Sequence, residues 1–345
     1  MRKNVLVTFD YELFLGENSG TVENNMLKPT DALLTVLKKH ELTPVFFVDT
    51  TYLQRLKMVA VEHGKAREDF DKIINQLREI IRHGGYIFHH IHPHWLDAVY
   101  IPETNQWNLG DKSRFALANL SEDEIAMVFS QSDEIISEIY QGQPLPPAFG
   151  FRAGGLYAQP FDIYRNEMLK HGISMDFSVL RNAQSTGAGG RYQFDYTACP
   201  EEGIYRFSDD ITVRDDQGNF TEVSMNMFRM KGLRKIINGL YYRKNVSKES
   251  WKRFGDGSAS GNVLKTAEKS AGKFLSEETF SIELLNDYKA TLYTSYLNKN
   301  DFMHIISHPK LCSVANIEAF DRFMQQAKRK HHIVSDVFEI IESIK

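Results

Sequence analysis

The chain has 345 residues, of which 42% are hydrophobic and 25% charged, and its formal net charge is −4. This composition excludes a disordered chain and provides enough apolar material for one large domain. The mild charge gives no reason to expect a nucleic acid or another polyanion as a partner. The two cysteines, Cys199 and Cys312, are far apart, so the sequence predicts neither a thiolate metal site nor a disulfide framework.

Short apolar runs alternate with helical patterns along most of the chain, and Ser121 with Glu124 forms a capping box at one helix start. The predicted strands are residues 5–9, 44–48, 86–90, 148–151, 174–180 and 302–306. The predicted helices are residues 31–40, 51–82, 121–140, 161–171, 317–330 and 335–344. This alternation predicts an α/β fold with parallel strands, either a barrel or an open doubly wound sheet. We expect a single domain over residues 1–345.

The apolar run near the N-terminus, Val5–Val7, is too short for a signal peptide, and no stretch of the sequence is apolar enough to span a bilayer. We therefore expect a cytoplasmic protein whose contact with a membrane, if it has one, is peripheral. The oligomeric state is not predictable from these patterns.

Residues 229–273 differ from the rest of the chain in charge. They contain twelve Lys or Arg residues against three acidic residues, a formal charge of +9, which leaves −13 for the remainder. We interpret this segment as a basic insertion. It is either a solvated helical face or a lid that meets an anionic substrate or a membrane surface.

Side chains that can perform chemistry stand at or just after the ends of four predicted strands. These residues are Asp10 and Glu12, His90 and His94, Arg152, and His308. The carboxyl ends of parallel strands meet at one face, where the active sites of α/β barrels lie.

The histidines and the acidic pair predict a catalytic metal site. Two imidazoles at i and i+4, His90 and His94, can bind one ion if the chain turns there, although Pro93 prevents a regular helix. Asp10 or Glu12 would supply a carboxylate, and the other could take a proton from bound water. The alternatives are a histidine-rich loop without a ligand and an acidic pair that caps a helix.

Two further histidines, His89 and His92, are expected to orient this site rather than to bind the ion. Arg152 could keep Asp10 ionised, with a surface arginine as the alternative, and the glycines that follow it indicate a close backbone approach. His308 could protonate a leaving amine, or it could be a structural histidine.

The order and spacing of these motifs resemble the polysaccharide deacetylase family, also called the NodB-homology family or carbohydrate esterase family four. The resemblance rests on five blocks: Thr8–Glu12, Val45–Val48, His90–His94, Phe151–Gly155 and Ile306–Pro309. It implies a distorted (β/α) barrel with seven strands that binds one divalent ion, often zinc.

The resemblance also implies a role for each candidate residue. By position, Asp10 matches the catalytic base, Arg152 the arginine that steadies it, and His308 the general acid. The metal ligands by the same comparison are Glu12, His90 and His94. The chain departs from the family pattern at Tyr11, which separates the two acids, at Ile91, where the family has Ser or Thr, and at Ala153–Gly155 after the arginine.

The implied activity is a metal-dependent N-deacetylase that releases acetate from an N-acetylated sugar. The expected cytoplasmic location and the basic insertion favour a sugar linked to a nucleotide or a lipid phosphate, as in surface-polysaccharide biosynthesis. Two alternatives remain open. One is a metal-dependent phosphoesterase, and the other is a non-catalytic glycan-assembly protein that retains the barrel.

Overall fold

The computed structural model describes residues 1–110, 113–186, 193–258 and 275–344. Residues 259–273 of the predicted basic insertion therefore lie outside the described residues. The chain divides into two compact units: unit one comprises residues 1–44 and 227–343, and unit two comprises residues 45–226 with 344–345. The expected single domain over residues 1–345 stays a prediction.

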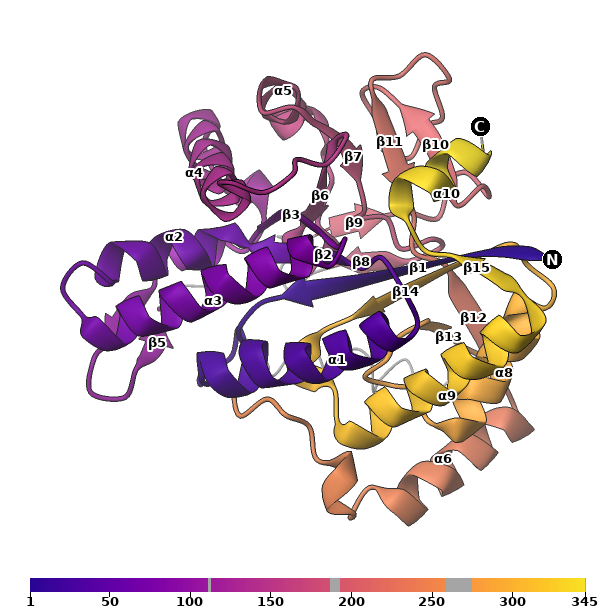
Figure 1. Cartoon of the computed structure of the whole chain (residues 1–345). Coiled ribbons are helices and arrows are strands. Elements are labelled where there is room, and N and C mark those ends of the chain that lie inside the picture. Colours follow the sequence, from indigo (N-terminus) through magenta and orange to yellow (C-terminus); the bar gives the residue numbers. More distant parts are fainter. Residues whose placement is uncertain (111–112, 187–192, 259–274, 345) are drawn as a thin grey trace. The chain divides into compact units, whose positions relative to one another are not determined.

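The centre of unit one is a parallel group of three strands (Figure 1). Strand β1 (Arg2–Tyr11) pairs in parallel with β14 (Phe302–Ser307) and with β15 (His332–Val334). All of β1 beyond its first residue is buried, which explains its almost continuous apolar sequence. The register pairs Phe9 with Ser307, the last residue of β14, and β1 continues for two residues beyond this pair.

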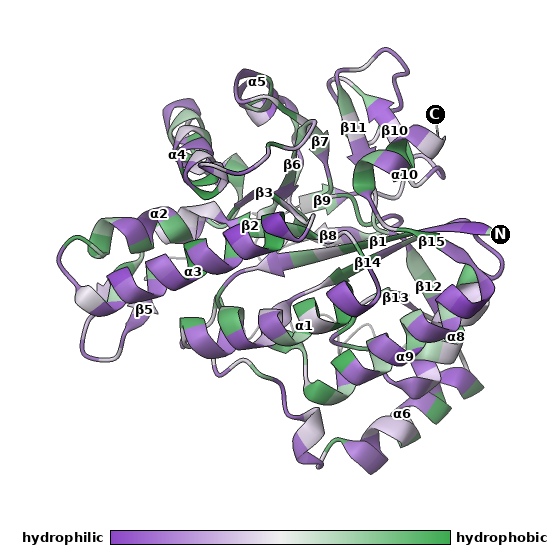
Figure 2. Cartoon of the chain, viewed as in Figure 1, coloured by the Kyte–Doolittle hydropathy of each residue, from purple (hydrophilic) through white to green (hydrophobic). Residues whose placement is uncertain are grey.

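Helices and one antiparallel strand pair complete unit one. The pair is β12 (Met227–Lys231) with β13 (Leu275–Thr279). The helices are α1 (Lys28–Lys39), α6 (Leu233–Asn245), α8 (Asp287–Leu297), α9 (Val314–Lys330) and α10 (Val337–Ile344). Helices α1 and α9 carry both hydrophobic and hydrophilic residues (Figure 2), as expected for helices with one buried side.

Unit two is built on a second set of parallel strands. In sheet order they are β2 (Val45–Asp49), β3 (Tyr86–Ile91), β6 (Phe149–Ala153), β7 (Ile173–Asp176) and β11 (Phe220–Val223), with β10 (Ile204–Phe207) antiparallel at the edge. Its helices are α2 (Thr50–Val59), α3 (Gly64–Arg82), α4 (Glu122–Tyr140) and α5 (Asp162–Lys170). Two short antiparallel pairs lie outside this sheet: β4 (Val99–Ile101) with β5 (Gln106–Asn108), and β8 (Gln184–Thr186) with β9 (Gln193–Asp195).

The α/β class predicted from the sequence is confirmed, and the alternating parallel strands and helices agree with a distorted (β/α) barrel. The capping box at Ser121 also forms and opens α4. The sequence patterns did not predict β10, β11, α6 or α8. In the part of the chain that the structure describes, no helix is long and apolar enough to cross a membrane.

Two fully buried carboxyl groups lie side by side in unit two, Asp176 at the end of β7 and its register partner Glu222 in β11. Backbone N–H groups of Ser178 and Val179 donate to them, at 2.7 and 3.2 Å respectively. Burial raises the pKa of Asp176 to about 6. Burial and the neighbouring Asp176 carboxylate raise the pKa of Glu222 well above its usual value. The pair therefore holds a proton that the same groups would lose in the unfolded chain.

This proton predicts a pH dependence of stability. The pKa values are higher in the folded state, so the stabilisation is complete below the unfolded pKa and is lost as pH rises through the folded pKa, about 6 for Asp176. Glu222→Gln keeps a hydrogen-bond donor beside Asp176 and removes one titrating group. We expect the loss in free energy of unfolding between about pH 5 and about pH 8 to be smaller in this variant, by about 1–3 kcal/mol.

Denaturant unfolding at several pH values measures this difference, and the exposed Glu201→Gln is the matched control. Equal slopes for Glu222→Gln and the wild type would show that the pair is ionised in the folded protein.

Candidate functional site

An acid–base pair forms where β1 and β14 end in unit one. Asp10 and Glu12 are buried, and the imidazole of His308 follows the last residue of β14. The Nε2 atom of His308 lies 3.5 Å from Asp10 Oδ2 and 3.8 Å from Glu12 Oε1. The His308 side chain keeps 28% of its surface exposed, so a substrate can reach it. Three of the residues predicted from the sequence are thus brought together within this unit.

The opposite nitrogen of His308 is held by Glu283, a residue that the sequence analysis did not identify. His308 Nδ1 lies 3.1 Å from Glu283 Oε1, and the backbone N–H of His308 donates to Glu283 Oε2 at 3.2 Å. The hydroxyl of Ser307 donates to the same carboxylate. Burial alone would lower the pKa of His308, but the bond to Glu283 and the charges of Asp10 and Glu12 outweigh it and raise that pKa. The imidazole is therefore set up as a proton donor.

Lys310 is a second residue that the sequence analysis missed. Its Nζ atom donates to Glu12 Oε1 at 2.8 Å and to the carbonyl oxygen of Leu13 at 2.6 Å, and it lies 4.9 Å from the ring centre of Phe14. Lys310 and Glu12 are both buried. A buried carboxylate beside a buried ammonium group stays ionised and oriented, and its second oxygen can serve as a metal ligand.

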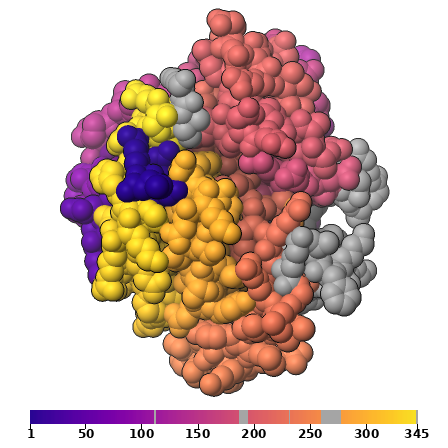
Figure 3. Space-filling model, turned by 90° about the vertical axis from the view of Figure 1, so that its right-hand side faces the viewer, coloured from indigo at the N-terminus to yellow at the C-terminus, as the bar shows by residue number. Residues whose placement is uncertain are grey.

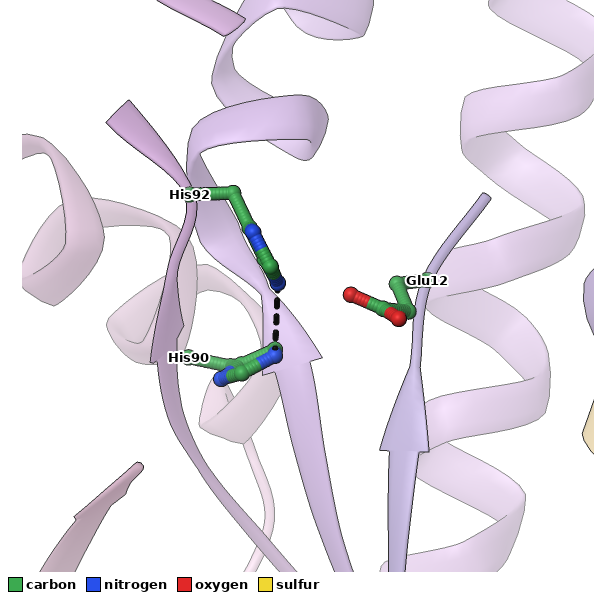
Figure 4. A group of neighbouring side chains, drawn as sticks. All are labelled: Glu12, His90 and His92. Carbon is green, nitrogen blue, oxygen red and sulfur yellow. Dashed lines mark hydrogen bonds between the residues drawn. The ribbon is translucent and has the colours of Figure 1, made fainter. Parts of the chain in front are cut away.

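In unit two the end of β3 brings two imidazoles together. His90 Nδ1 lies 2.7 Å from the carbonyl oxygen of Arg152, which fixes this nitrogen as the donor and leaves Nε2 with its lone pair. That Nε2 lies 2.9 Å from the Nε2 of His92, and the two rings are perpendicular (Figure 4). A metal-binding histidine usually donates a hydrogen bond from its other ring nitrogen, for example to a backbone carbonyl, as His90 Nδ1 does to Arg152.

The start of helix α2, together with Asp49 at the end of β2, anchors this histidine segment. Thr51 Oγ1 accepts from the backbone N–H of His92 at 2.9 Å, and Thr50 Oγ1 donates to the carbonyl of His90 at 3.0 Å. The indole of Trp95 donates to the buried Asp49 carboxylate at 2.6 Å. These bonds hold both imidazoles before any ligand binds.

The other two histidines have different surroundings. His89 is fully buried, its Nδ1 lies 2.9 Å from Ser132 Oγ, and burial lowers its pKa to about 3, so this ring is neutral. His94 lies in the short 3-10 helix η2 (Pro93–Asp97), where its ring stacks on Phe115 with centroids 5.6 Å apart. The structure therefore places the Nε2 atoms of His90 and His92 next to each other. The predicted ligand role of His94 stays a prediction.

Arg152 is fully buried, which excludes the surface arginine considered from the sequence. Its Nε donates to the carbonyl of Phe177 at 3.1 Å, and its guanidinium lies 4.0 Å from the centre of the Phe47 ring. The predicted close approach after it is also present. A Cβ atom on Gly154 would lie 2.6 Å from the carbonyl oxygen of Ile91 and 2.8 Å from His92 Nδ1.

A cavity of about 350 Å³ lies in unit one next to Glu283. Its lining residues come from α6, from the short η6 helix (Glu249–Trp251) and the loop after it, from the start of α8 and the loop before it, from the turn after His308, and from α9. They include two aromatic residues, Tyr242 and Trp251, and three asparagines, Asn238, Asn286 and Asn316. Aromatic walls with a few polar groups are typical of small-molecule sites.

Comparison with known proteins gives structural likenesses only. No protein-family model matches the sequence, and no curated protein matches it. A Mycobacterium smegmatis structure described as a polysaccharide deacetylase is 14% identical, with 99% of this chain and 89% of that chain covered and a TM-score of 0.48. A family 4 carbohydrate esterase from Streptomyces lividans is 11% identical, with 97% and 92% covered and a TM-score of 0.40.

A branching enzyme of glycoside hydrolase family 57 from Thermococcus kodakaraensis is also similar, with 10% identity, 100% and 72% covered and a TM-score of 0.48. Structures described as a polysaccharide deacetylase, as a family 4 carbohydrate esterase and as peptidoglycan N-acetylglucosamine deacetylases are neighbours over nearly the whole chain. These likenesses concern the fold alone.

Gly154 provides a test of the histidine pair. Gly154→Ala places a methyl group against the Ile91 carbonyl and the His92 ring, so one of them must move. We expect the affinity for zinc, measured by competition with a chromophoric chelator, to fall about tenfold or more because the ligand geometry is disturbed.

Gly64→Ala in the same unit is the control, since its added Cβ has no neighbour within 4 Å. Unchanged zinc affinity in a folded Gly154→Ala protein would contradict a metal-binding role for His92.

Proposed function

We propose that this protein is a metal-dependent N-deacetylase that releases acetate from an N-acetylated sugar. The observation that carries the proposal is His308, whose Nε2 lies 3.5 Å from Asp10 while Glu283 holds its Nδ1. This places a carboxylate that can accept a proton beside an imidazole that can donate one. Hydrolysis of an amide needs both, because an amine leaves only after it is protonated.

We infer that one divalent ion is held by Glu12, His90 and His92, and zinc is the first choice of metal. The side chains of all three are buried, and in unit two the rings of His90 and His92 approach each other through their Nε2 atoms (Figure 4). Two neutral imidazoles and a carboxylate are a common zinc set that leaves a position for water. The fit is supported by His90, whose Nδ1 faces the Arg152 carbonyl and whose Nε2 therefore keeps its lone pair. A bound zinc ion supplies acidification of water and polarisation of a carbonyl group.

The residues of unit one perform the proton transfers in this proposal. Asp10 accepts the proton of the attacking water. His308 then donates its Nε2 proton to the amide nitrogen as the carbon–nitrogen bond breaks, and acetate and a free amine are the products. Glu283 positions the ring and favours its protonated form, while Lys310 orients Glu12.

The cavity next to Glu283 is the place that we propose for the sugar. Trp251 and Tyr242 offer flat apolar faces for a pyranose ring, and the asparagine amides can meet hydroxyl groups. Because Glu283 lines this cavity and also holds His308, a sugar bound there would lie close to the proton donor.

Substitution of the proton-transfer residues tests the reaction. We expect Asp10→Asn and His308→Gln to lower kcat for acetate release by about 10²–10⁴-fold, the usual contribution of general acid–base catalysis. Acetate is measured with a coupled enzymatic assay on N-acetylated sugars, and metal content is measured on the same samples. His308→Gln should retain its metal, because His308 is not among the proposed ligands.

The exposed His332→Gln serves as the control and should leave kcat unchanged. Near-normal turnover in either Asp10→Asn or His308→Gln would rule out the assigned roles.

A further inference from the structure

Helix α6 of unit one presents its hydrophobic side to solvent. The exposed fractions are 70% for Leu233, 60% for Ile236, 39% for Ile237 and 60% for Leu240. Their spacing of i, i+3, i+4 and i+7 puts all four on one side of the helix. Helix α6 belongs to the orange segment at the bottom of Figure 3.

The polar side of α6 faces the protein instead. Asn238 Oδ1 accepts from the amide of Asn286, and the hydroxyl of Tyr241 donates to Asp287, both at 2.8 Å. Asn245, on the same side, is buried. A helix on a water-soluble protein ordinarily has the opposite orientation, because apolar surface is more stable away from water. An apolar stripe that faces solvent indicates a surface that binds a partner or a membrane.

The charges around the stripe identify its partner. Residues 233–252 contain six basic side chains against one acidic residue, Glu249, whereas the whole chain is at −4. The basic residues are Arg234, Lys235, Arg243, Lys244, Lys248 and Lys252. A second copy of the chain would bring these like charges together, which opposes association through α6. A nucleic acid would match the charge but would leave the apolar stripe uncovered.

An anionic lipid surface satisfies both features. Apolar side chains of an interfacial helix enter the boundary between head groups and acyl chains, and the flanking Lys and Arg residues meet acidic head groups. Tyr242 is 51% exposed, and its ring centroid is 6.3 Å from that of Trp251, so the segment also carries the aromatic residues that are enriched at membrane interfaces.

We propose that α6 is an interfacial helix that binds this protein to the surface of an anionic membrane. This inference stands without the reaction proposed above. One consequence does depend on the proposed function. Because α6 also lines the cavity next to Glu283, a membrane-bound protein would present that cavity at the lipid surface, where a lipid-phosphate-linked sugar is found.

Co-sedimentation of the full-length protein with lipid vesicles tests the proposal. We expect binding to vesicles that contain phosphatidylglycerol, with at least about tenfold weaker binding to pure phosphatidylcholine and marked weakening by salt. Ile236→Glu/Leu240→Glu puts two carboxylates in the middle of the stripe and should weaken binding by about tenfold or more. Arg243→Glu/Lys244→Glu should weaken binding to the vesicles that contain phosphatidylglycerol and leave binding to pure phosphatidylcholine unchanged.

Leu145→Glu is the matched control, because Leu145 in unit two is 69% exposed and the sequence has no Lys or Arg between Arg114 and Arg152. It should bind vesicles as the wild type does, and thermal unfolding checks that every variant is folded. Absence of wild-type binding to the anionic vesicles, or equal binding by Ile236→Glu/Leu240→Glu, would overturn the proposal. So would a wild-type dimer that this variant converts to a monomer in light scattering, because α6 would then be a contact between copies.

Discussion

The parallel pairing of β1 with β14 is the constraint on which the proposed proton-transfer groups depend. Because Phe9 lies opposite Ser307, the residues that follow them, Asp10 and His308, emerge at one level from neighbouring strands. Burying charges here would be unfavourable without partners, since isolated ions lose several kcal/mol of hydration. Glu283 and Lys310 provide those partners, so the same contacts that make burial tolerable also fix the orientation of the reacting groups.

The same logic holds within unit two for the imidazoles. His90 and His92 are anchored through their backbones by Thr50 and Thr51, and the ring of His90 by the carbonyl of Arg152. None of these anchors competes for the Nε2 atoms, which are left to face each other. Backbone groups and the hydroxyl groups at the start of α2 therefore fix the positions of the two histidines. A metal site needs its ligands to be preorganised in this way.

Strand-end reasoning predicted much of the fold and most of the candidate site. It placed Asp10, Glu12 and His308 at neighbouring strand ends, where the structure brings them together, because polar residues directly after an apolar run stand where the carboxyl ends of parallel strands meet. Their catalytic and ligand roles stay predictions. The ligand role of His94 rested on helical i, i+4 spacing. In the structure β3 continues to Ile91 and His92 is still extended, so the period of two places the rings of His90 and His92 on one side.

Other residues were beyond sequence reasoning for physical reasons. Glu283 follows β13, a strand whose sequence, Leu-Ser-Glu-Glu-Thr, has no apolar run to reveal it, and its role arises only through the long-range contact with His308. Periodicity shows that α6 has an apolar stripe but not which way the stripe faces, because that depends on hydrogen bonds to α8.

The most direct test of the central claim is one assay that follows metal content and released product together, on purified protein given N-acetylated sugars and an aryl phosphate. We expect one bound divalent ion per chain and release of acetate without phosphate. Release of phosphate without acetate, or no bound metal after reconstitution, would contradict the claim.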